Sequence, residues 1–120
     1  LGLLGIHTFK GENGRNVPWQ EVLQWTAENS SLPDFSFWKD RIMYGTLCAV
    51  YVSGYQQGLA AGKIAREILV EGKPPSECPI RSTKKGQPVL SLARARMLGI
   101  PVKSSILLTA KVVPTFAWEK

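Results

Sequence analysis

Residues 46–52 form the segment that most constrains what this chain can fold into. They are apolar and β-branched nearly throughout, and they end at a small polar turn, Ser53-Gly54, as a buried strand does. A long helix is expected directly afterwards, over residues 55–71, and Gly72 is placed to end it. A buried strand that leads straight into a long helix is typical of an α/β fold.

Strand-like and helix-like segments alternate along the rest of the chain. Residues 39–45 fit either a turn or a single helical turn. We expect strands at residues 1–8, 35–38 and 88–90, helices at 18–29 and 92–98, and a partly extended stretch at 106–116. Because strands and helices alternate in order, the sequence predicts an α/β fold with a mostly parallel sheet flanked by helices.

Two glycines, Gly58 and Gly62, lie inside the predicted long helix. Each costs about 1 kcal/mol relative to alanine in a helix interior. A close approach of the helix to a neighbouring sheet would offset that cost, so we expect this face of the helix to pack tightly.

Composition narrows the class of protein. At 120 residues, with 44% apolar and 20% charged side chains, the chain suits one folded core. No apolar run approaches the roughly 18–20 residues that a membrane-spanning helix needs. Its first residues have the pattern of a core strand, so we expect further chain upstream of Leu1.

Positive charge gathers in the last two fifths of the chain. Residues 1–72 hold six Lys/Arg and seven Asp/Glu, a net of −1, whereas residues 73–120 hold nine and two, a net of +7. Such asymmetry suits a nucleic-acid or membrane partner, or a tail that covers an acidic surface elsewhere. No block of five consecutive like charges occurs, so a nucleic-acid partner is not expected.

The sequence carries none of the patterns that mark enzymatic chemistry. It has no G-x-S-x-G, no phosphate-binding glycine loop and no metal-ligand spacing, so we expect no enzyme, no cofactor and no metal. The single histidine, His7, is interpreted as a structural or edge-of-site residue rather than a base. Cys48 and Cys78 leave one disulfide open as a possibility, although no spacing rule favours it.

Ligand binding is the function that the pattern favours, because ligands bind beyond the carboxyl ends of the strands in such sheets. Trp38 and Tyr55 follow predicted strand ends and are the candidates for stacking against an organic solute. Thr8 and Ser53 are the candidates for polar contacts with it. Arg41 could pair with a carboxylate on the solute, and a solvated surface role fits the sequence equally well.

Part of the chain resembles a known family. Residues 45–58 read G-T-L-C-A-V-Y-V-S-G-Y-Q-Q-G, followed by A-G-K-I-A at 61–65 and G-K-P at 72–74. This order of strand, small polar turn, aromatic residue, helix with glycines four apart and G-K-x-P loop is similar to the ABC transporter substrate-binding proteins. The likeness is to the carboxyl-terminal portion of a periplasmic binding protein, type 1-like, and it covers about two thirds of the chain.

The resemblance implies a bilobed protein that clamps a small solute between two α/β lobes. Residues 1–80 would be an incomplete carboxyl-terminal lobe, and residues 81–120 would be a crossover tail returning towards a missing amino-terminal lobe. The intact protein would lie outside the cytoplasm, periplasmic or anchored to the membrane, and deliver an amino acid or another small organic solute to an ABC permease.

Some features remain open within this resemblance. Members of the family often carry an acidic residue facing the ligand before the main strand, but residues 37–41 here read F-W-K-D-R, so the preferred ligand charge is undecided. The same fold could instead sense a ligand as the extracytoplasmic part of a signalling protein. Apolar residues of the tail could also join two copies of the chain in a homodimer: Leu107, Leu108, Val112 and Val113.

Overall fold

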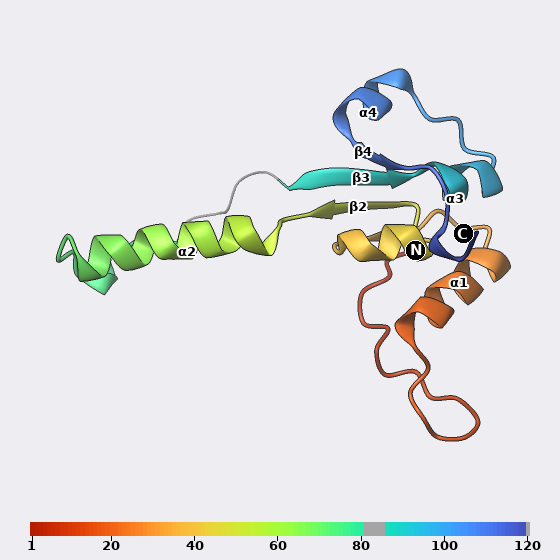
Figure 1. Cartoon of the computed structure of the whole chain (residues 1–120), viewed down its shortest axis with the longest axis horizontal. Helices are drawn as coiled ribbons and strands as arrows, with labels where there is room; N and C mark the ends of the chain where they lie inside the picture. The colour runs from red at the N-terminus through yellow and green to blue at the C-terminus, as the bar shows by residue number, and fades with distance from the viewer. Residues whose placement is uncertain (81–85, 120) are drawn as a thin grey trace. The chain divides into compact units, whose positions relative to one another are not determined.

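The chain divides into two compact units. The computed structural model describes residues 1–80 and 86–119, drawn in Figure 1. One unit comprises Leu1–Tyr51 with Gln87–Lys120, and the other comprises Val52–Gly86. The expected lobe (1–80) and tail (81–120) concern a longer, bilobed protein and stay a prediction; residues 81–85 of that tail lie outside the described residues.

The first unit is built on a four-stranded sheet in the order β1 (Phe35–Ser36), β2 (Cys48–Tyr51), β3 (Gln87–Ser91), β4 (Lys111–Val113). The pairs β1–β2 and β3–β4 are parallel, and β2–β3 is antiparallel. The predicted mostly parallel sheet is therefore confirmed. The antiparallel pair was not expected; the chain between β2 and β3 is assigned to the second unit.

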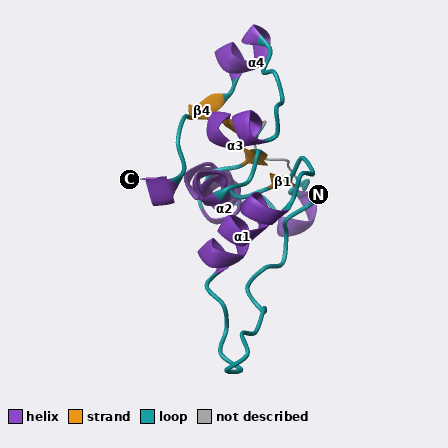
Figure 2. Ribbon diagram, turned by 90° about the vertical axis from the view of Figure 1, so that its right-hand side faces the viewer, coloured by secondary structure: helices purple, strands orange, loops and turns teal. Residues whose placement is uncertain are grey.

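Short helices connect the parallel pairs. A 3-10 helix, η1 (Lys39–Tyr44), joins β1 to β2, and α3 (Leu92–Met97) and α4 (Ser104–Thr109) lie between β3 and β4. The predicted helix before the sheet is α1 (Trp19–Asn29). In Figures 1 and 2, α4 lies beyond the β4 edge of the sheet and α1 lies towards the opposite edge, so helices flank the sheet as predicted.

The core lies on both faces of the central strand pair. Ala49 faces Val89 and Cys48 faces Leu90 in the β2–β3 register, and these two pairs point to opposite faces because side chains alternate along a strand. Three apolar clusters follow from this arrangement and from α1: Ile42, Ala49 and Val89; Leu47, Leu90 and Ala95; and Leu3, Ile6 and Leu23.

One expectation about strands was wrong, and a second, that residues 106–116 are partly extended, was confirmed in part. Residues 1–8 do not form a strand; they make one parallel bridge, Gly2 to Phe35, and bury only Leu3 and Ile6. The stretch 106–116 contains β4 but begins inside α4, because a run of adjacent apolar residues has no period that separates helix from strand.

The second unit is dominated by α2 (Gly54–Leu69), followed by a short 3-10 helix, η2 (Pro75–Glu77). The predicted long helix is confirmed, but the expected tight packing at its glycines is not. A Cβ added at Gly58 or Gly62 would meet no atom within 4 Å, and α2 has no buried residue. In the parts of the chain that the structure describes, no helix is long and apolar enough to cross a membrane.

Candidate functional site

A hollow of about 220 Å³ opens in the first unit, beside the start of α1 and η1. Its lining combines two indole rings with three polar side chains: His7, Trp19, Trp38, Asp40 and Arg41. Aromatic walls with a few placed polar groups are typical of sites for small organic molecules. This hollow is therefore our candidate functional site.

Arg41 is the most constrained group of the site. Only 3% of the residue is exposed, and its guanidinium carbon lies 4.2 Å from the centre of the Trp38 ring. One terminal nitrogen, Nη1, donates to the Leu3 carbonyl, and the other, Nη2, lies 3.4 Å from His7 Nε2. Because a guanidinium has donors only, His7 Nε2 can take part in this contact only as the acceptor.

A buried serine joins the parts of the site to one another. Ser36 Oγ donates to the Leu3 carbonyl at 3.1 Å and accepts from the Trp38 backbone N–H at 3.5 Å. The Leu3 carbonyl thus accepts hydrogen bonds from both Ser36 and Arg41. Sequence reasoning missed this serine, because the Phe-Ser-Phe alternation of residues 35–37 favours the phenylalanines on the buried face, whereas both phenylalanines are exposed and Ser36 is buried.

The wall formed by Trp19 is held by a second aromatic contact. The rings of Trp19 and Tyr44 meet edge to face, with centroids 5.1 Å apart. This geometry is favourable for two aromatic rings, and it orients Trp19 from behind.

The structure brings two of the five predicted site residues together, Trp38 and Arg41. Thr8 is exposed beside His7 and does not line the hollow. Ser53 and Tyr55 belong to the second unit. There, Ser53 Oγ accepts from Gln56 N at 3.2 Å as the N-cap of α2, and Tyr55 is 76% exposed on the first turn. Participation of Thr8, Ser53 and Tyr55 in binding stays a prediction.

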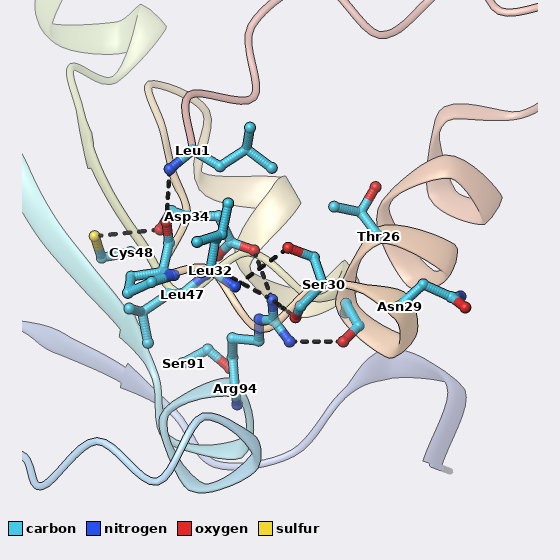
Figure 3. Close-up of polar contacts among 12 residues, drawn as sticks. Leu1, Thr26, Asn29, Ser30, Leu32, Asp34, Leu47, Cys48, Ser91 and Arg94 are labelled. Atoms are coloured by element: carbon cyan, nitrogen blue, oxygen red, sulfur yellow. Dashed lines mark hydrogen bonds and ion pairs between the residues drawn. The ribbon is translucent and has the colours of Figure 1, made fainter.

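A second network of polar contacts, which sequence reasoning also missed, joins α1 to the sheet (Figure 3). Arg94 and Asp34 are both buried, and Arg94 Nη2 lies 3.2 Å from Asp34 Oδ2. Asp34 Oδ1 accepts from Leu47 N at 2.5 Å. Arg94 also donates to three carbonyls around the end of α1, those of Ala27, Ser30 and Leu32. These bonds satisfy carbonyls at a helix end, which is a structural task.

Neither a metal cluster nor a disulfide is found within residues 1–80 and 86–119. No group of three or more His, Cys, Asp or Glu side chains is placed there to hold a metal ion. Cys48 and Cys78 are both free thiols. Burial, and next the negative charge of Asp34, raise the pKa of the Cys48 thiol, which makes it a poor nucleophile at neutral pH.

Comparison with known proteins decides the family. Residues 17–113 match the family described as ABC transporter substrate binding protein. The chain belongs to this family. The resemblance noted in the sequence is thereby confirmed for about four fifths of the chain, including Trp38 and Arg41.

Solved structures have the same fold as this substrate-binding family member. An ABC domain from Streptococcus pneumoniae, in complex with L-Trp, is 26% identical to this chain, with a TM-score of 0.61. The match covers 77% of this chain and 32% of the Streptococcus chain. A conserved domain protein from Vibrio cholerae is 21% identical (TM-score 0.57; 79% of this chain, 40% of its own). An open, ligand-free substrate binding protein with adhesive properties from Clostridium difficile is 20% identical (TM-score 0.61; 80% and 31%).

The chain spans about a third of the length of these substrate-binding structures, up to two fifths for the Vibrio protein. The two structures below 25% identity show the α/β fold alone. No curated protein matches the chain.

Proposed function

We propose that this chain is part of the extracytoplasmic solute-binding component of an ABC-type importer, and that it captures a small organic solute without changing it chemically. Membership of the substrate-binding family supports this function. So does the absence of any catalytic pattern in the sequence.

The observation that carries the proposal is the stacked Trp38–Arg41 pair beside the hollow. Trp38 is half exposed, so part of its ring is available to a solute, whereas Arg41 beneath it is buried. An indole ring offers flat apolar area and a guanidinium offers directed donors. Together they suit a solute with a flat apolar part and a polar group.

The solute is proposed to be an amino acid or a similar small organic molecule. The Streptococcus pneumoniae structure holds L-Trp, which combines such a flat part with charged groups. The hollow, at about 220 Å³, is smaller than the roughly 300–1,000 Å³ of a complete ligand pocket. We therefore propose that it is one wall of a cleft between lobes, and that the missing lobe supplies the other.

The partners and location follow from the same proposal. The intact protein would work in the periplasm or anchored at the outer side of the membrane, and would hand its solute to an ABC permease. Thr8, Ser53 and Tyr55 are proposed as further contacts with the solute, in a cleft that hinge motion between lobes would close.

A thermal-shift screen of the intact protein against amino acids and other small organic compounds tests the function. A solute that binds only the folded state raises the melting temperature. We expect at least one compound to do so, and we expect Trp38→Ala to abolish the shift. Trp25→Ala, which removes an exposed tryptophan outside the hollow, is the matched control and should keep it. A shift that survives in Trp38→Ala would place the solute elsewhere.

A further inference from the structure

The described part of the chain contains two buried arginines, and they differ in how their charge is compensated. Arg94 lies against the carboxylate of Asp34 at 3.2 Å and donates to three carbonyls as well. Arg41 is almost as buried, at 3% exposure. Among the described residues, however, no carboxylate lies within ion-pair distance of Arg41.

Among the described residues, the groups that contact the Arg41 guanidinium include no carboxylate. They are the Leu3 carbonyl, the His7 imidazole and the face of Trp38. Asp40 lines the same hollow, but it is exposed and makes no ion pair with Arg41. Burial lowers the pKa of the Arg41 guanidinium from its ordinary value, yet an arginine stays protonated in proteins. A positive charge therefore stands uncompensated at the wall of the hollow.

An uncompensated buried charge is costly, and a ligand of opposite charge offsets that cost. Two of the five N–H donors of a guanidinium are engaged here, by Leu3 and His7, so three are left for a ligand. Arg41 is also fixed in place from three sides. A fixed planar fork is the geometry that receives a carboxylate, or another planar or tetrahedral oxyanion, through two parallel bonds.

We propose that Arg41 makes this site selective for solutes that carry an anionic group next to a flat aromatic body, the group bonding to the guanidinium and the body lying against Trp38. This inference rests on the proposed solute-binding function and adds the charge of the solute to it. For the ligand charge that the F-W-K-D-R segment left open, the proposal favours an anion. Ser36, which bonds to the same carbonyl as Arg41, acts as a positioning residue.

Two probes that share an indole ring and differ in charge test the proposal by calorimetry with the intact protein. Indole-3-acetate carries a carboxylate, and tryptamine carries an ammonium. We expect indole-3-acetate to bind at least 10-fold more tightly than tryptamine, and up to about 100-fold, because a hydrogen bond to a charged group is among the stronger ones. This comparison in the unaltered protein needs no variant to fold.

Variants then assign the preference to one side chain. Arg41→Gln should remove the difference between the two probes, whereas Arg15→Gln, in the exposed loop outside the hollow, should keep it. Equal affinities for the two probes, or tighter binding of tryptamine, would overturn the anion preference. The solute-binding function would still stand if Trp38→Ala weakens binding of the probes. Failure of both probes while other screened solutes bind would also overturn it. Failure of every solute would overturn the proposed function itself.

Discussion

At the scale of single residues, the two buried arginines have different roles. Arg94 is locked between Asp34 and the carbonyls at the end of α1, so its guanidinium is fully occupied apart from one buried donor, Nε. Arg41 contacts no carboxylate among the described residues and faces a hollow. The same residue type thus stabilises the fold at one position and supplies an unpaired charge at another.

The Arg94–Asp34 pair makes a direct prediction about stability. Arg94→Met should lower the free energy of unfolding by about 3–5 kcal/mol, because it leaves the buried Asp34 carboxylate without its partner. Urea unfolding measures this loss. The control is Arg66→Met, which breaks the exposed pair with Glu71 and should cost about 1 kcal/mol or less. Equal, small losses in both variants would show that the buried pair contributes little.

Gly45 makes a second prediction, which concerns space and backbone conformation together. Its φ is +107°, and a Cβ there would lie 2.7 Å from the Ala27 Cβ. Gly45→Ala should therefore destabilise the fold by about 1–3 kcal/mol. Gly14 also has a positive φ, +72°, but a Cβ added there would meet no atom within 4 Å. Gly14→Ala should therefore lower the free energy of unfolding by less. The melting temperatures of the two variants compare these costs, and the reverse order would contradict the packing at Gly45.

Sequence reasoning found some of these residues and missed others for a physical reason. Trp38 was predicted because it follows a predicted strand end, and Arg41 was a candidate because its guanidinium could pair with a carboxylate on the solute. The partners Asp34 and Arg94 are 60 residues apart, and no local pattern links a carboxylate in a loop to an arginine on a short helix. Ser36 was missed because the phenylalanines on either side of it favour the other face as the buried one, and because its bond to Leu3 joins residues 33 positions apart.

At the scale of elements, periodicity predicted the helices well and the strand pairing less well. The helix expected at 18–29 is α1 and the one expected at 92–98 is α3, where Ser91 Oγ accepts from Arg94 N at 3.2 Å as the N-cap. The direction of β3 against β2 was not readable, because it depends on whether the connecting segment packs on the sheet. Pairing is a long-range property that the pattern of one segment does not contain.

The glycines of α2 test how that helix is used. In the structure both Gly58 and Gly62 face open space, so Gly58→Ala and Gly62→Ala should each stabilise the helix by about 0.5–1 kcal/mol. Amide hydrogen exchange along α2 in the intact protein would measure the gain. Ser53→Ala should act in the opposite direction, by about 1 kcal/mol, because it removes the N-cap. If the alanines destabilise α2, the helix packs closely in the intact protein.

At the scale of the whole molecule, we propose that the chain is one part of a larger solute-binding protein. It spans about a third of the solved structures that it matches, and its hollow is one wall of the proposed cleft. The tail keeps Leu107 and Leu108 exposed, at 40% and 86%, so association through this surface, with a second copy or another part of the protein, stays a prediction. The net charge of +7 in residues 73–120 fits the same proposal, in which an acidic surface on a second lobe would be its partner.

The most direct test of the central claim is a crystal structure of the intact protein with the tightest-binding solute bound. We predict that the flat part of the solute lies against the Trp38 ring and that an oxygen of its anionic group lies within hydrogen-bond distance of Arg41. A solute bound with both of these side chains free of contact would contradict the account.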